Sequence, residues 1–399
     1  MLAVAAGTAC GGGRTYSLAP LPAPTVIPYP ATPAALRFSP AEMDEFLAAL
    51  PPLRARRPVT LAFVGDINLG TLTLEHGIPP DSGRGLLAAV DSLLDGDLVV
   101  GNFESTLADS GTPEKCLAYD GSVRRNCYAF VTPTYLAPRL GEAGFTHVTI
   151  ANNHANDLGP SGRETTIRNL RAAGLEVVGP VGMIARDTLW RADSATVVGL
   201  IGFTTYAHSY DLLDSAASAA VVDSIRPLVD VLVVTFHGGT EGSRAVHTGR
   251  GPEFLGREPR GDLRRWARTV IDAGADAVVG HGPHVLRGIE FYRGKPIVYS
   301  LGNFVTYRGF NLSGPLGVTA VLRLTLSPEG KFLEGRIVPL VQHPGTGPAP
   351  DPGARAVGLV RRLSREDFGA GGAVVDAGGS FGPPPAPREA GAGREGADP

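Results

Sequence analysis

Residues 59–66 have the sequence VTLAFVGD, a continuous apolar run that ends in a glycine and an aspartate. Short apolar runs that are rich in β-branched residues and bounded by turn residues predict buried strands. Similar runs follow at 97–104, 145–154, 175–179, 195–203, 229–239, 275–284, 296–304, 317–326 and 334–340. Amphipathic segments that predict helices lie between several of them, at 83–94, 134–143, 162–173 and 261–273. This alternation predicts an α/β fold, and the strand-rich stretch after Pro296 indicates mixed sheets.

The composition of the chain limits the classes of protein that it can be. Of its 399 residues, 43% are hydrophobic, which is enough to bury a sizeable core. The formal net charge is -3, and no basic stripe stands out, so we expect no nucleic-acid partner.

The two ends of the chain differ in composition from the part between them. Residues 1–57 combine a short leader with a Pro/Ala-rich stretch that is typical of an extended tether, with a short helix expected at 41–50. The main domain is expected at 58–345. A C-terminal helix over 354–368 is expected to pack on it within residues 346–376. The Gly/Ala/Pro-rich stretch at 377–399 predicts a disordered tail.

The chain begins with a run of small apolar residues that ends in Cys10. Such a run resembles the end of a bacterial lipoprotein signal, although the usual basic residues before it are missing. The alternative is an unstructured N-terminus. The run is too short to span a membrane, so the lipoprotein interpretation predicts an extracytoplasmic protein attached by a lipid on Cys10 alone.

Cys116 and Cys127 are the two remaining cysteines. They lie in a loop-like stretch, and with Cys10 set aside for lipidation they suit one disulfide in an oxidising compartment. The alternative is a pair of unrelated thiols.

Metal-capable side chains follow several of the predicted strands. The runs lead to Asp66 and Asn68, to Glu104, to Asn153 and His154, to His237, and to His281 and His284. Ligands bind beyond the carboxyl ends of strands in α/β sheets, so these groups are expected to meet in one polar pocket. Carboxylate, amide and imidazole groups suit a pair of divalent cations, which activates water for attack on phosphorus. A further imidazole can protonate the leaving oxygen.

The order of these motifs resembles the CapA family, which is associated with poly-γ-glutamate capsule synthesis and is similar to calcineurin-like metallophosphoesterases. The motifs are Gly65-Asp66-Ile67-Asn68, Asn102-Phe103-Glu104, Asn152-Asn153-His154, His237-Gly238-Gly239-Thr240-Glu241, Gly280-His281-Gly282-Pro283-His284 and Ser300-Leu301-Gly302-Asn303-Phe304.

The resemblance implies a four-layer αββα sandwich with two divalent ions, Mn, Fe, Zn or Mg, at its edge. It implies metal ligation by Asp66, Asn68, Glu104, Asn153, His237, His281 and His284, with Glu104 bridging the ions and His154 as the catalytic residue. Asn68 and Glu104 stand where the broader phosphoesterase pattern has His and Asp, and two residues instead of one separate His281 from His284.

Several neighbouring residues have two interpretations each. Asp157 either orients His154 or caps the helix that follows. Glu241 either binds metal or supports a ligand histidine, or it is a solvated loop residue. Asn303 either points into the pocket or forms a strand-end turn. Asn102 and Asn152 are expected to support the ligands, while Tyr206 and His208 are candidates for lining the substrate cleft.

Two functions are expected from this pattern. The first is a metal-dependent hydrolase of phosphoester type that acts on a phosphorylated envelope substrate or an anionic polymer. The second is a non-catalytic accessory subunit that binds a polymer such as polyglutamate within a polyglutamate synthase membrane complex. A binding protein with decayed metal ligands is a weaker alternative, because the ligand set is intact.

Overall fold

The computed structural model describes residues 56–120, 122, 127–191 and 194–385. The leader with Cys10, most of the tether, the helix expected at 41–50 and residues 386–399 lie outside the described residues. Within the described part, no helix has both the length and the apolar composition needed to cross a bilayer.

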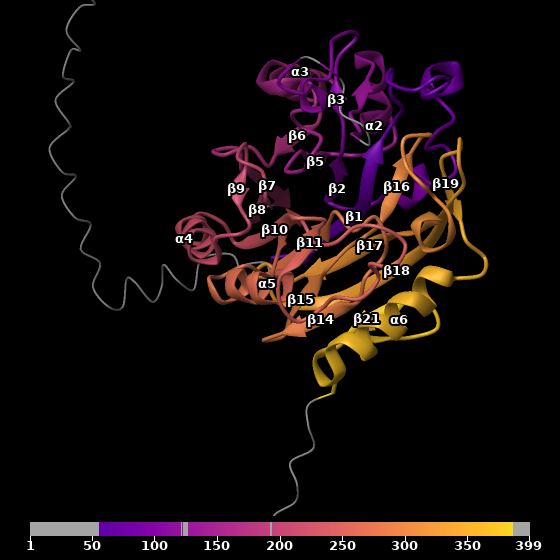
Figure 1. The fold of residues 1–399 in the computed structure, drawn as a ribbon. Helices are drawn as coiled ribbons and strands as arrows, with labels where there is room; N and C mark the ends of the chain where they lie inside the picture. The colour runs from indigo at the N-terminus through magenta and orange to yellow at the C-terminus, as the bar shows by residue number, and fades with distance from the viewer. Residues whose placement is uncertain (1–55, 121, 123–126, 192–193, 386–399) are drawn as a thin grey trace, which may run out of the picture. The chain divides into compact units, whose positions relative to one another are not determined.

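Two mixed β-sheets form the centre of the domain (Figure 1). The larger sheet has the order β20-β21-β18-β17-β1-β2-β5-β6, with β16 beside β1 and β19 beside β18. Its strands are β1 (Val59–Asn68), β2 (Leu98–Phe103), β5 (His147–Thr149), β6 (Glu176–Val178), β16 (Asn303–Thr306), β17 (Val318–Leu326), β18 (Phe332–Gln342), β19 (Pro348–Pro350), β20 (Val374–Val375) and β21 (Ser380–Gly382). Strands β1, β2, β5, β6 and β16 run parallel, whereas β17 and β18 are antiparallel additions.

The smaller sheet has the order β14-β15-β13-β10-β8-β7, with β9 beside β8. Its strands are β7 (Ala185–Arg191), β8 (Ser194–Thr204), β9 (Tyr210–Asp211), β10 (Val231–His237), β13 (Ala277–His281), β14 (Ile289–Tyr292) and β15 (Lys295–Val298). Two short ribbons are separate from both sheets: β3 (Thr106–Leu107) with β4 (Val131–Thr132), and β11 (Glu253–Leu255) with β12 (Glu258–Gly261).

Alternate side chains of the central strands enter different apolar layers. Phe63 of β1 and Val233 of β10 belong to the cluster between the sheets, while their neighbours Val64 and Val234 belong to the two outer clusters. This two-residue alternation is the ordinary pleat of a strand that is buried on both faces.

Helices complete the outer layers. On the larger sheet, Leu140 of α2 (Pro138–Glu142) and Leu170 of α3 (Gly159–Ala172) enter the outer cluster. On the smaller sheet, Val222 of α4 (Ser215–Ile225) and Trp266 of α5 (Leu263–Asp272) do the same. The order is therefore helix, sheet, sheet, helix, and the expected αββα arrangement is confirmed.

The helix expected at 83–94 is not formed. The segment is a series of turns in which most amides bond three residues back, such as Val90 to Leu87. It starts at the end of a 3-10 helix (Pro80–Gly83) and includes a second one at Asp91–Leu93. Leu86, Leu87, Val90 and Leu94 are buried, so the apolar pattern is correct. The Leu86 carbonyl lies directly against Gly347, where a Cβ would come within 1.6 Å of its oxygen.

Helix α4 was not predicted, although the sequence contains buried positions at helical spacing and an N-terminal capping residue. Its residues are mostly small, which hides the amphipathic pattern, yet Ser218, Val222 and Ile225 are buried at helical spacing. Asp214 caps it by accepting from the amides of Ala216 and Ala217, an N-terminal signature that the sequence does carry.

The ordered chain continues past residue 376, into the stretch whose composition predicts disorder. Helix α6 (Arg355–Phe368) is followed by β20 and β21, and β21 pairs with β18. Phe381 is buried among aromatic rings that include Phe291 and Phe332, and Gly335 leaves room for it. One large apolar residue thus orders a segment that is otherwise rich in glycine and proline.

Cys116 and Cys127 form a disulfide, as predicted. Replacing both with serine is expected to lower the free energy of unfolding by about 3 kcal/mol, the effect of closing a loop of this length in the unfolded chain. Urea denaturation without reductant measures it. The urea midpoint of reduced wild type should then equal that of the double variant. If both midpoints equalled that of oxidised wild type, the prediction would be wrong.

Candidate metal centre

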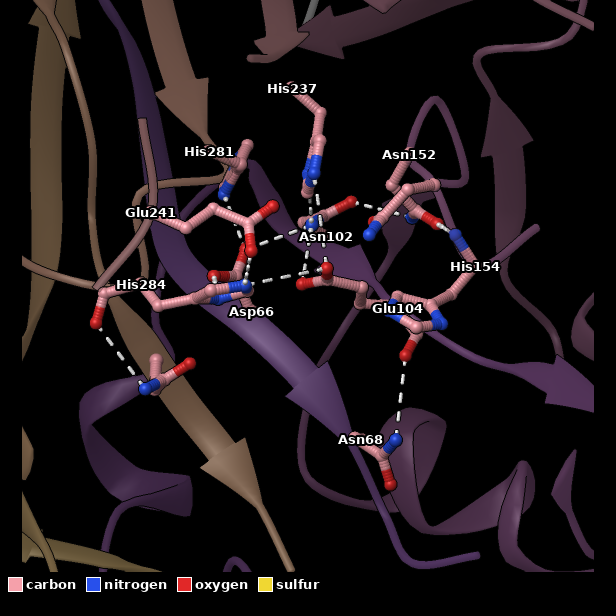
Figure 2. A network of polar contacts seen from close by, with 12 residues as sticks. Asp66, Asn68, Asn102, Glu104, Asn152, His154, His237, Glu241, His281 and His284 are labelled. Carbon is pink, nitrogen blue, oxygen red and sulfur yellow. Dashed lines mark hydrogen bonds and ion pairs between the residues drawn. The ribbon is translucent and has the colours of Figure 1, made fainter. Parts of the chain in front are cut away.

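Polar side chains from both sheets converge at the carboxyl ends of their central strands (Figure 2). Asp66 of β1 lies in register with Asn102 of β2, and Glu104 follows directly after β2. In the smaller sheet, His237 ends β10 and lies in register with His281, which ends β13. The two sheets therefore present carboxylates from one side and imidazoles from the other.

Glycines allow the backbones to meet at this edge. A Cβ on Gly65 would lie 1.9 Å from the carbonyl oxygen of Gly302, and the Asp66 amide donates to that same oxygen at 2.8 Å. Gly282 has a φ of 114°, and a Cβ there would lie 2.6 Å from the carbonyl oxygen of Gly238. Because Gly238 and Gly282 follow His237 and His281, this contact fixes the two imidazoles side by side.

Asp66, Glu104 and His284 form the closest group of ligand atoms. Nδ1 of His284 lies 2.9 Å from Oδ2 of Asp66, and Nε2 of His284 lies 3.9 Å from Oε1 of Glu104. One ligand atom from each of these three residues lies within 4.8 Å of the others. Nδ1 of His281 lies 3.5 Å from Oδ1 of Asp66, and Asn102 donates to that oxygen at 2.8 Å.

Buried polar atoms at this group lack partners among the described residues. The atoms without a hydrogen-bond partner are Oε1 of Glu104 and both ring nitrogens of His281. Each buried polar atom left unpaired costs on the order of 1–3 kcal/mol, so native proteins rarely retain several together without a ligand. Oxygen and imidazole donors in this mixture suit a divalent cation, and the residues present therefore fit a metal ion.

The charges of the group are strongly coupled. Burial opposes ionisation of Asp66, but the imidazoles of His281 and His284 lower its pKa well below the usual range. Burial and the charge of Asp66 raise the pKa of Glu104 well above its ordinary value. Burial also lowers the pKa of His237, whereas the charges of Glu104 and Asp66 outweigh burial at His284 and raise its pKa to about 10.

These shifts predict that metal uptake releases protons. The metal-free site holds a proton on His284 at pH 7, and the raised pKa of Glu104 favours its protonated form; a divalent ion must displace any proton on these atoms to bind them. The apparent affinity should therefore increase with pH up to the pKa of His284 near 10. Calorimetric titration with Mn²⁺ in two buffers of different ionisation enthalpy counts the protons, and a heat independent of the buffer would contradict the prediction.

His154 lies beside this group and is held by three neighbours. Its Nδ1 donates to Oδ2 of Asp157 at 2.7 Å, and its ring packs on that of Phe130 with 4.3 Å between the ring centres. Nζ of Lys115 lies 3.3 Å from Nδ1 of His154 and 3.3 Å from Oδ1 of Asp157. Burial lowers the pKa of His154, with the charges of Lys115 and His284 adding to the effect. The imidazole is thus neutral, with Asp157 fixing the tautomer that leaves Nε2 as the base.

Asn102 and Asn152 connect His154 to the ligands. The amide of Asn152 donates to Oδ1 of Asn102 at 2.9 Å and accepts from the His154 amide at 3.0 Å. Asn102 in turn donates to Asp66, so a continuous chain of hydrogen bonds joins the expected catalytic residue to the expected metal ligand (Figure 2).

Comparison with known proteins identifies the family. The pattern of the bacterial capsule synthesis protein PGA_cap family matches residues 60–308. The chain belongs to the PGA_cap family. The expected resemblance to CapA is therefore confirmed.

Individual relatives of this PGA_cap chain are distant. PGA biosynthesis protein CapA of Bacillus subtilis is 26% identical over 306 residues, which cover 73% of each chain. Capsule biosynthesis protein CapA of Bacillus anthracis is 28% identical over 273 residues, covering 64% of this chain and 62% of that one. Among solved structures, the 5′-nucleotidase precursor of Thermus thermophilus matches with a TM-score of 0.42 and 18% identity, over 77% of this chain and 59% of that one.

Two of the expected ligands of the PGA_cap site, Asn68 and Asn153, make no hydrogen bond to the side chains of the closest group among the described residues. The amide oxygen of Asn68 accepts from the Gly70 amide at 3.0 Å, and its nitrogen lies 3.5 Å from the main-chain oxygen of Glu104. Asn68 therefore holds the backbone of the site and does not point at the carboxylates (Figure 2). The Oδ1 of Asn153 is buried without a hydrogen-bond partner among the described residues, as are Oε1 of Glu104 and the ring nitrogens of His281.

The remaining candidates surround the centre. Glu241 approaches His284, with 3.8 Å between Oε2 and Nε2. Asn303 donates to the main-chain oxygens of His284 and Leu316, so it supports the turn that carries His284. A cavity of about 340 Å³ opens beside them and is lined by Glu241, Gly242, Ser243, His284, Asn303, Phe310, Asn311 and Leu316.

Tyr206 and His208, the candidates for lining a substrate cleft, have their polar atoms in hydrogen bonds with other parts of the protein. The Tyr206 hydroxyl accepts from Arg260 at 2.9 Å and contacts Glu258. Nε2 of His208 lies 3.3 Å from the Ile150 carbonyl, and burial lowers its pKa to about 4.

Two residues at this site, Arg260 and Lys115, were not predicted, because nothing in the sequence around them indicates a place in the metal centre. Arginine is common throughout the chain, and Arg260 lies 23 residues after the histidine that it contacts. Lys115 precedes Cys116 in the disulfide loop, and its backbone amide donates to the Asp157 carbonyl, which places its side chain beside His154.

Proposed function

We propose that this PGA_cap chain is a divalent-metal-dependent hydrolase of phosphoester type that acts outside the cytoplasm during synthesis of a capsule or related envelope polymer. The observation that carries the proposal is the group formed by Asp66, Glu104 and His284, with unpaired buried ligand atoms around it and His154 next to it.

The residues of the chain have separable roles in this proposal. Asp66, Glu104 and His284, with His281 beside Asp66, would hold the cation. A bound divalent ion supplies Lewis acidity towards the phosphoryl oxygen and activates water for attack. Asp157 holds Nδ1 of His154, which leaves Nε2 free to move a proton to or from the oxygens of the substrate. The ligand set accepts Mn, Fe, Zn or Mg, since it combines carboxylates with imidazoles.

The location and substrate are part of the same proposal. The Cys116–Cys127 disulfide suits an oxidising compartment, and Cys10 would carry the lipid that attaches the chain to the membrane. The relatives concern capsule and PGA biosynthesis, so the substrate would be a phosphorylated envelope precursor or an anionic polymer, handled beside a polyglutamate synthase complex.

One experiment tests the hydrolase directly. Protein stripped of metal and reloaded with Mn²⁺ should hydrolyse bis(p-nitrophenyl) phosphate, and the metal-free protein should not. His154→Asn should lower kcat by about 10²–10⁴-fold, the range of general acid–base catalysis, while the bound metal stays unchanged. Metal-loaded protein without turnover on a panel of phosphomonoesters and phosphodiesters would refute the hydrolase.

A second candidate function rests on a different surface. A cavity of about 480 Å³ at α5 is lined by Arg250, Gly251, Asp262, Arg264, Arg265, Arg268, Thr269 and Asp272. Arg250 and Arg265 have no ion-pair partner among the described residues, so an anionic chain could neutralise them. This surface favours an accessory subunit that binds polyglutamate. Binding of oligoglutamate that Arg265→Ala weakens, in a protein without turnover, would favour it.

A further inference from the structure

Arg260 places a permanent positive charge inside the candidate metal centre. It lies in β12, and its side chain is fully buried. Its Nη2 lies 2.9 Å from Oε1 of Glu241 and 3.2 Å from Nε2 of His237. A guanidinium stays protonated in proteins, so this charge cannot be removed by a change of protonation.

Arg260 is also fixed in position. Its Nε donates to the carbonyl of Gly239 at 3.2 Å, and its Nη1 donates to the Tyr206 hydroxyl at 2.9 Å and to Glu258 at 3.3 Å. With Nη2 at Glu241 and His237, all three guanidinium nitrogens are engaged. The guanidinium is therefore held in a fixed position beside the ligands of the centre.

The contact with Arg260 occupies the electron pair that His237 would offer to a metal. A neutral imidazole has one lone pair, and Nε2 faces an obligate donor in Arg260. Nδ1 faces the amide nitrogen of Asn102 at 3.4 Å, and this amide is oriented because its oxygen accepts from Asn152. Both nitrogens of His237 thus lie within 3.4 Å of a donor, and the nearest carboxylate oxygen, Oε1 of Glu104, is farther away at 3.9 Å from Nε2. The ring nitrogens of His281 have no hydrogen-bond partner among the described residues.

The charges of the centre agree with a single divalent ion. The carboxylates of Asp66, Glu104 and Glu241 face one guanidinium, which leaves two negative charges once the imidazoles are neutral. Glu258, the other carboxylate on Arg260, is 44% exposed, so solvent screens its charge. One divalent cation balances the two negative charges. A second cation at His237 would be uncompensated in a buried site and would lie against the Arg260 charge.

We propose that the centre takes one divalent cation, at Asp66, Glu104 and His284, and that the Arg260 guanidinium occupies the place of the second cation that the family resemblance predicts. Arg260 is then a positioning residue, which holds Glu241 and His237 around the single ion. This inference rests on the proposed metal site but not on the reaction assigned to it.

Metal counting with Mn²⁺ tests the inference independently of activity. Metal-free wild type is titrated with Mn²⁺, the bound ion is counted by elemental analysis, and the spin state is read by electron paramagnetic resonance. We expect one Mn²⁺ per chain with the spectrum of an isolated ion. Two ions per chain with an exchange-coupled spectrum would overturn the proposal, whether or not the protein is an enzyme, and no bound ion would overturn both proposals.

Variants separate the charge of Arg260 from its packing. Arg260→Met removes the charge at similar length and should admit a second Mn²⁺, whereas Arg260→Lys should keep the count at one. Arg287→Met is the matched control, because Arg287 is equally buried but contacts Glu253, Thr240 and Ala245 instead of the ligands. A count of one in folded Arg260→Met would refute the exclusion by charge. If that variant does not fold, the wild-type spectrum still decides.

Discussion

Replacing Asp66 with asparagine is expected to remove the bound metal and lower kcat/KM by more than about 100-fold, the largest loss usual for a residue that only supports a ligand. The amide keeps the shape of the carboxylate but lacks its charge. It also presents a donor where Asn102, His281 and His284 all approach an acceptor. Metal content after dialysis, followed by turnover with added Mn²⁺, measures the effect.

The same exchange at an exposed carboxylate is the control. Asp109 accepts from Thr134 at the surface, so Asp109→Asn should keep the metal and the turnover of wild type. If Asp66→Asn kept the metal content of wild type, Asp66 would not be a metal ligand. The proposed function would then have lost the group of residues on which it rests.

Replacing Trp266 with alanine is expected to cost about 3–5 kcal/mol of unfolding free energy. The indole of Trp266 is fully buried under the smaller sheet, where it meets Phe203 at 5.4 Å and Phe236 at 5.2 Å. Its Nε1 donates to the hydroxyl of Ser218 on α4 at 2.9 Å, so alanine leaves a cavity and removes this hydrogen bond, while the hydroxyl still donates to the Asp211 carbonyl. Chemical denaturation measures the loss.

The chain contains its own control for this experiment. Trp190, on the edge strand β7, is 75% exposed, and Trp190→Ala should change the unfolding free energy by less than about 0.5 kcal/mol. Equal losses for the two variants would mean that α5 does not pack on the sheet as described.

The sequence predicted the strands and the positions of the main ligands because both depend on local patterns. Each apolar run such as 59–66 is long enough to indicate a strand by itself, and the ligands follow from where these runs end. The CapA resemblance then supplied the αββα arrangement, which no single run contains.

Other features depend on contacts between distant segments, which a local pattern does not contain. The turns at 83–94 have the apolar spacing of a helix, but the chain at Gly347 packs against them. Asn68 has a side chain that can bind metal and stands at a ligand position of the motif, yet its amide oxygen accepts a hydrogen bond from the Gly70 amide. Arg260 reaches His237 only through the β11–β12 ribbon, whose course the sequence does not reveal.

The ligands of the candidate centre come from both sheets, and this gives the ion a mechanical role. Asp66 and Glu104 belong to one sheet and His281 to the other, so an ion held by all of them would be a cross-link between the two halves of the sandwich. At a concentration 1,000 times its dissociation constant, such an ion would add about 4 kcal/mol to the unfolding free energy. The concentration of divalent ions around the protein would then affect its folding stability as well as its activity. A chelator would lower the free energy of unfolding by removing the link between the two sheets.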